Sequence, residues 1–219
     1  MERLQLLRNR VLPLLALGLV LLLALWVVLA PAESRLGNIV KLVYVHGALV
    51  WAGLFTFSVA GLVGLVALVV RHLVGPAERA RVWCCGTEAA SLAALIVWAV
   101  YVISAMAVTG LAWGQLVAWN EPRVRVTGLI LVGGVVLYVV ARLVDHADFT
   151  AVTSLLMGIV PWVMVLQADA IRHPVDPIGG SGSAAIQGFY LLIELTVAGL
   201  AATLVAWLWV RAVQSDRDP

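Results

Sequence analysis

Six long apolar runs, separated by short polar stretches, constrain this chain more than any other feature of its sequence. They cover residues 11–30, 39–70, 82–112, 127–143, 150–166 and 184–210. An α-helix needs about 20 apolar residues to cross a bilayer core of about 30 Å, and the fourth and fifth runs lie near the lower limit. Only 12% of the residues are charged, about half the share in a soluble domain. The sequence therefore predicts an all-α integral membrane protein with six transmembrane helices, forming a single membrane domain over residues 1–219.

The first run shares features with a signal peptide. It follows three arginines and ends at Ala30-Pro31-Ala32, a pattern of small residues typical of a cleavage site. The apolar part of a signal peptide spans about 7–15 residues, and this run is longer. We therefore expect the run to be retained as the first membrane helix.

The basic residues predict the orientation of the helices, because cytoplasmic loops carry an excess of Lys and Arg. With six spans, both chain ends share one side of the membrane, and nine of the 14 basic residues fall on that side. We predict a multi-pass protein of the plasma (inner) membrane with both termini cytoplasmic. Because the basic residues are spread between apolar runs, we expect membrane lipid as a partner and no nucleic acid. The five basic residues on the outer side are Arg35, Lys41, Arg123, Arg125 and Arg172.

Two histidines lie on the predicted outer side. His46 is near the start of the second run, and His173 is in the connection before the last run. The second run is longer than a bilayer core, so we expect its first turns to project outward and to place His46 near the surface. Neutral imidazole is a good axial ligand for haem iron. An interfacial histidine is also commonly an ordinary amphipathic residue, and that interpretation stays open.

A passage rich in aromatic and charged residues, 109–127, lies on the same side as these histidines. It contains Trp113 and Trp119, followed by Pro122 and the two arginines of this passage. Proline and the neighbouring polar residues interrupt a continuous helix, which predicts a loop or a segment lying on the surface. Indole rings pack well against a planar macrocycle. The residues alone thus place two possible metal ligands and several aromatic side chains on one side of the membrane.

Two motifs resemble those of the CcmC-type haem-handling proteins of cytochrome c maturation, in the CcmC/CcsA-like cytochrome c assembly family. The segment from Lys41 to Trp51 is similar to the start of that family's second helix, with the pattern basic-x-x-Tyr-x-His. The passage 109–127 is similar to the family signature Trp-Gly-x-x-Trp-x-Trp-Asp. The matching residues are Trp113, Gly114 and Trp119, while Val117 and Asn120 replace a tryptophan and the aspartate, as in a divergent member. The resemblance covers residues 36–211.

The resemblance implies a haem-binding protein that presents or transfers haem at the outer face of the membrane for c-type cytochrome biogenesis. Non-covalent haem b would lie between His46 and His173 as iron ligands, with Trp113 and Trp119 packed against it. Its partners would be a CcmE-like periplasmic haem chaperone, an ABC-type CcmA/CcmB pair and a small CcmD-like protein. Lys41, Arg123 and Arg125 have the charge to bind the haem propionates, although such cations also contact lipid head groups.

Glu194 lies within the last apolar run, where a charge is costly and an acid is a functional candidate by default. A protonated carboxyl bonded inside the helix bundle is the simpler interpretation. No set of side chains in the sequence indicates bond-making chemistry, so we expect a carrier rather than an enzyme. Two alternatives stay open. One is a cofactor-free structural or assembly subunit of a membrane complex, and the other is a small-molecule or proton-coupled transporter that uses Glu194.

Overall fold

The computed structural model describes residues 2–33, 36–75, 77–169, 171 and 178–216, and in these ranges the regular secondary structure is helical. Six of the helical segments are long and apolar enough to cross a membrane, which confirms the predicted number. The elements are α1 (Glu2–Leu6), η1 (Leu7–Val11), α2 (Leu12–Leu29), α3 (Val40–Val69), η2 (Val70–Val74), α4 (Ala77–Trp113), α5 (Pro122–Val144), α6 (Ala147–Gln167), η3 (Gly179–Ser181) and α7 (Ala184–Ser215).

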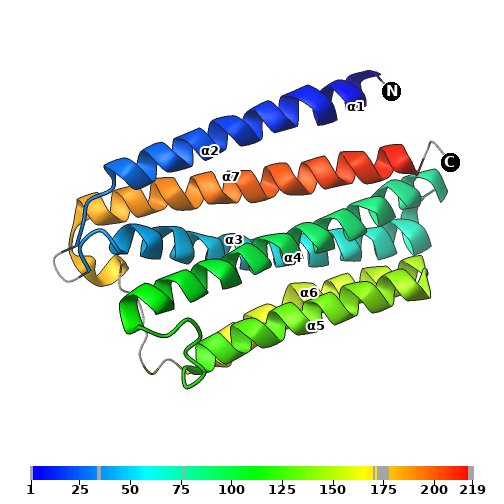
Figure 1. Ribbon diagram of the computed structural model, residues 1–219. Coiled ribbons are helices and arrows are strands. Elements are labelled where there is room, and N and C mark those ends of the chain that lie inside the picture. Colours follow the sequence, from blue (N-terminus) through cyan, green and yellow to red (C-terminus); the bar gives the residue numbers. More distant parts are fainter. Residues whose placement is uncertain (1, 34–35, 76, 170, 172–177, 217–219) are drawn as a thin grey trace.

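Helix α3 lies at the centre of the bundle and packs against α4, α6 and α7. Helix α2 packs on α7 at one edge, and α5 packs on α6 and α4 at the other (Figure 1). The start of α1 and the end of α7 lie at the same end of the bundle, which we call the terminal end (Figure 1). Helices α3, α5 and α7 begin at the opposite end, which we call the loop end. We refer to the corresponding parts of the bundle as its terminal half and its loop half.

The predicted loop 109–127 is wrong at both of its boundaries. Helix α4 continues to Trp113, and α5 already begins at Pro122, so the non-helical part covers only residues 114–121. Proline is well suited to the first position of a helix, because the N–H that it lacks would have no partner within the helix there. Arg123 and Arg125 therefore lie on the first turn of α5 rather than in a loop.

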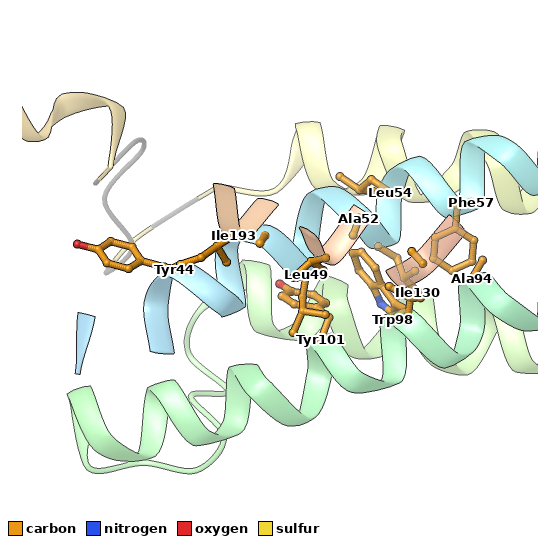
Figure 2. Packing of buried hydrophobic residues seen from close by; sticks show 14 of the residues in the cluster. Tyr44, Leu49, Ala52, Leu54, Phe57, Ala94, Trp98, Tyr101, Ile130 and Ile193 are labelled. Carbon is orange, nitrogen blue, oxygen red and sulfur yellow. The ribbon is translucent and has the colours of Figure 1, made fainter. Parts of the chain in front are cut away.

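The core of the bundle contains aromatic rings from α3 and α4 (Figure 2). Trp98 packs edge-on against Phe57, with 5.7 Å between ring centroids, and its ring lies 4.6 Å from that of Tyr101. The indole N–H of Trp98 donates to the carbonyl of Thr127 on α5 at 3.1 Å. A buried indole is stabilised when its N–H is paired in this way. These contacts fix the register of α3, α4 and α5 beside the loop end.

In the terminal half, α3 and α6 cross with their backbones in contact. A Cβ atom added to Gly158 would lie 2.8 Å from the Cα of Gly61, closer than real Cβ contacts. One turn further along α3, a Cβ on Gly64 would lie 2.7 Å from the carbonyl oxygen of Ala151. Small residues at helix crossings replace the hydrophobic driving force that lipid does not supply. The glycines at positions 61, 64 and 158 therefore let the two helices approach this closely.

Helix α6 contains a proline, Pro161, immediately beyond this crossing. Proline removes one backbone hydrogen bond and lets a helix change direction. On its loop-end side, Trp162 contacts side chains of α3, with its ring 5.8 Å from that of Phe55 and its indole N–H donating to Ser58 at 2.8 Å. Beyond Trp162, Val165 and Leu166 line a cavity together with residues of α3. Within about two turns, the two helices thus pass from backbone contact at Gly158 to lining the same cavity.

Candidate functional site

A cavity of about 950 Å³ occupies the loop half of the bundle. Its walls come from the loop-end turns of α3, α4, α5, α6 and α7, together with the connection between α4 and α5. We call it the loop-end cavity. Ligand pockets in proteins commonly have volumes of about 300–1,000 Å³ and are mostly apolar with a few polar groups. This cavity has that size and that kind of lining.

His46 lines the loop-end cavity but is not at the surface, contrary to what the length of its helix predicted. Only 7% of its surface is exposed, because α4 covers this turn of α3. The ring of Tyr101 stacks on the imidazole with 5.0 Å between centroids. The hydroxyl of Tyr101 lies 3.2 Å from that of Thr127, so the stacking ring is itself fixed by α5.

The hydrogen bonds around His46 favour one of the two neutral forms of its ring. Its Nδ1 atom lies 3.2 Å from the hydroxyl oxygen of Ser104. That hydroxyl donates its single proton to the backbone carbonyl of Tyr101 at 2.7 Å. A hydroxyl that donates there accepts from Nδ1–H, and this arrangement leaves the lone pair of the neutral ring on Nε2. This tautomer presents a nitrogen with the chemistry of a metal ligand.

The two predicted tryptophans both line the cavity, from different structural elements. Trp113 is the last residue of α4, and Trp119 lies in the connection 114–121 with 68% of its surface exposed. Gly114 begins this connection with a φ of 70°, a conformation that favours glycine. The Thr109 hydroxyl lies 2.9 Å from the carbonyl oxygens of both Ala105 on α4 and Leu116, which places the connection against the end of α4. Trp119 is thus an exposed aromatic side chain held at the rim of the cavity.

The three predicted propionate-binding cations have different positions. Arg123 lines the cavity, and its Nε atom is buried with no hydrogen-bond partner in the part of the chain that the structure describes. Arg125 is exposed and is not among the lining residues. Lys41 donates to the carbonyl of Val28 at the end of α2, at 2.7 Å, and it also lies outside the cavity lining. The structure therefore brings one of the three cations together with His46.

The second predicted iron ligand, His173, lies outside the described residues, so its position relative to His46 stays a prediction. Within the described ranges, no three His, Cys, Asp or Glu residues gather in a way that would hold a metal ion. A haem site does not need such a cluster, because the porphyrin supplies four of the iron's ligands and the protein supplies one or two axial ones.

Two acidic residues have positions that the sequence did not reveal. Glu121 has only 1% of its surface exposed, and its carboxylate accepts from the backbone N–H of Ile171 at 3.1 Å, which joins the segment after α4 to the segment after α6. Asn120, the residue at the position of the family's aspartate, is exposed. Glu194 lines the loop-end cavity from α7, and is therefore in the same cavity as His46 rather than at a separate site. No local pattern in the sequence connects residues so far apart along the chain.

A glycine on α3 makes room for the α7 wall of the cavity. A Cβ atom on Gly47 would lie 3.0 Å from the hydroxyl oxygen of Tyr190, so any larger residue at this position would press on that ring. Tyr190 lies one turn before Glu194 on α7. Gly47 thus sets how closely the polar residues of α7 approach the helix that carries His46.

The donor set of this cavity suits a planar, mostly apolar ligand with acidic groups. The fit to haem follows from three observations: an imidazole in the ligating tautomer, aromatic residues at the rim, and a buried guanidinium nitrogen with no described partner. A buried donor without a partner is costly, and a carboxylate is the partner that guanidinium binds best. The residues present therefore fit the group that the sequence motifs imply.

Comparison with known proteins gives a weak but extensive similarity. No protein-family model matches the chain. The chain is 28% identical to "Heme exporter protein C" of Bradyrhizobium diazoefficiens over an alignment of 211 residues, and the match covers 90% of this chain and 74% of that protein. The described fold and this similarity together characterise a multi-pass, all-helical membrane protein that resembles a haem exporter protein C over most of its length.

Proposed function

We propose that this protein binds haem b non-covalently in the loop-end cavity and presents it for transfer during c-type cytochrome biogenesis. His46 would offer one axial nitrogen, Arg123 would pair with a propionate, and Trp113 and Trp119 would cover the ring. His173 is proposed as the second axial ligand on the basis of the sequence motif. Bound haem supplies the iron that these histidines ligate, and the protein acts as a carrier rather than an enzyme.

The observation that carries this proposal is the meeting of His46 and Arg123 in one cavity at the end of the bundle opposite the termini. An imidazole oriented by Ser104 and a guanidinium with an unused buried donor are complementary to a metal centre and to carboxylates, respectively. The similarity to a haem exporter protein C supports haem as the ligand that combines these groups.

The proposed orientation places the loop end on the outer side of the plasma (inner) membrane and both termini in the cytoplasm. The excess of Lys and Arg at the terminal end supports this orientation. Haem held at the loop end would then face a CcmE-like periplasmic chaperone. We further propose that an ABC-type CcmA/CcmB pair and a small CcmD-like protein are partners, as the sequence motifs imply. Cysteine labelling of the connection 114–121 with a membrane-impermeant reagent in intact cells tests the orientation.

The absorbance spectrum of the purified protein tests haem binding. We expect a b-type spectrum for the wild type, and a loss or shift of its bands in His46→Ala and His173→Ala. His146→Ala is the matched control, because His146 is exposed at the terminal end of α6 and lies outside the cavity lining. Bands unchanged by His46→Ala would contradict the proposed ligand.

The two alternative functions predict different outcomes from the same preparation. A cofactor-free assembly subunit would bind no haem. In cells that lack the protein, the wild type and His46→Ala would then restore its function equally well. A proton-coupled transporter would bind no haem, and Glu194→Gln would abolish its transport. The similarity to a haem exporter protein C favours the haem carrier over both alternatives.

A further inference from the structure

The loop-end cavity contains charges of opposite sign on different walls. Arg123 reaches it from α5, and Glu194 reaches it from α7. Helix α5 packs on α4 and α6, whereas α7 packs on α2, α3 and α4. The guanidinium and the carboxylate form no ion pair in the part of the chain that the structure describes. A ligand in the cavity therefore meets each charge separately.

The contacts between helices place these two charges at different depths. Thr127 contacts Tyr101, which stacks on His46, and Arg123 lies four residues before Thr127, one turn nearer the loop end. On the other wall, Gly47 faces Tyr190, and Glu194 lies four residues after Tyr190, one turn nearer the terminal end. The offset is two helical turns along the bundle axis, about 11 Å.

His46 lies between the two charges along this axis, because it is adjacent to Gly47 and stacks on Tyr101. An amphipathic ligand centred on His46 would thus have one edge towards Arg123 and the opposite edge towards Glu194. No described residue hydrogen-bonds to the Glu194 carboxylate or pairs with it. Because the group lines a cavity rather than packing inside the bundle, we take it to be ionised when water fills the cavity.

The geometry points to Glu194 as a selectivity residue that weakens the hold of the cavity on dicarboxylate ligands. This inference rests on the proposed function, since it concerns the same cavity and its cargo. Carboxylates are attracted to Arg123 and repelled by Glu194, so a dicarboxylate porphyrin binds with its acidic edge towards the loop end. The remaining repulsion lowers its affinity, which favours release to a receiving protein. A charge that disfavours one arrangement of a ligand is a common source of specificity.

The test compares two fluorescent probes, zinc protoporphyrin IX and its dimethyl ester, in titrations of the full chain in lipid nanodiscs. The two probes share one ring and differ in the charge of the propionate groups. For Glu194→Gln we expect the Kd of the dicarboxylate to fall about three- to ten-fold, as Coulomb repulsion over 10–15 Å in a protein environment predicts. The Kd of the diester stays unchanged and shows that the cavity remains folded.

Two further variants separate charge from shape. Glu194→Asp keeps the charge and is expected to bind both probes as the wild type does. Asp169→Asn removes an exposed carboxylate of the loop end that does not line the cavity, and is expected to change neither Kd. Equal shifts for the two probes in Glu194→Gln, no shift, or weaker dicarboxylate binding would overturn the inference. Failure of the wild type to bind either probe would instead overturn the proposed function.

Discussion

The two halves of the bundle use the same pair of helices, α3 and α6, in opposite ways. In the terminal half, Gly61 and Gly158 bring the two backbones into contact. In the loop half, beyond Pro161, the helices enclose part of a cavity of about 950 Å³. The close packing in the terminal half holds the two helices together. The loop half can therefore contain a cavity without the bundle coming apart.

Several polar side chains of the terminal half are paired with one another across helices. In the terminal half, Ser91 and Ser154 are hydrogen-bonded at 2.6 Å, and Arg71 pairs with Asp148 at 3.1 Å. Arg142 likewise pairs with Glu88, although the buried amide of Gln214 departs from this pattern. In the loop half, the buried Nε atom of Arg123 has no described partner. An unpaired buried group is costly in a folded protein unless a ligand uses it, so within the loop half the Nε atom of Arg123 is the group that points to binding.

The largest expected effect comes from the glycine crossing. Gly158→Leu would push a side chain into the backbone of α3, which cannot move aside, and we expect the free energy of unfolding in detergent to fall by about 3 kcal/mol or more. Gly133→Leu on α5 is the matched control, because a Cβ there meets nothing within 4 Å. Equal thermal stability of the two variants would remove the distinction between the halves.

The next effect concerns the cations. Arg123→Gln removes the only predicted propionate partner that lines the cavity, and the haem affinity is expected to fall about thirty-fold, or about 2 kcal/mol for a charge-assisted hydrogen bond. Lys41→Gln is expected to leave the affinity unchanged, since the Lys41 amino group donates to Val28. Haem titration of both variants measures this difference. A similar loss for Lys41→Gln would show that the ligand extends beyond the cavity.

A glycine in the loop half sharpens the comparison, because it should respond in the opposite way to Gly158. Gly128 lines the cavity, and a Cβ there meets nothing within 4 Å. Gly128→Leu would fill part of the cavity, so we expect unchanged thermal stability and an affinity for haem about ten-fold lower, or about 1.4 kcal/mol. Lower stability with unchanged affinity would place Gly128 in the packed part of the bundle.

The smallest effect tests the buried hydroxyl pair. Ser154→Ala removes the hydrogen bond to Ser91, and interhelical bonds of this kind contribute about 0.6 kcal/mol in membrane proteins. We expect a decrease of that size in the free energy of unfolding and no change in haem affinity. A double-mutant cycle with Ser91→Ala isolates the pair. A change in affinity would mean that the halves are coupled more closely than their packing indicates.

The sequence predicted the parts of this fold that depend on local composition. Six apolar runs became six helices long enough to cross a membrane, with the aromatic passage between the third and the fourth. It did not predict that Pro122 begins a helix, that Lys41 reaches α2, or that Glu194 shares a cavity with His46. These features depend on how helices pack together, and runs of apolar residues carry little information on register. The pairing of His46 with His173 stays a prediction.

The bond from the Ser104 hydroxyl to the main chain has a chemical consequence for any metal that reaches His46. In this arrangement the Nδ1 proton is bonded to the Ser104 hydroxyl, and that hydroxyl is bonded to the carbonyl of Tyr101. Neither of these two groups gains or loses a proton near neutral pH. The ring is therefore preorganised, and no proton has to move inside the protein when a metal–nitrogen bond forms or breaks. Exchange at this residue should then proceed at nearly the same rate in heavy water, governed by the incoming and departing metal ligands alone.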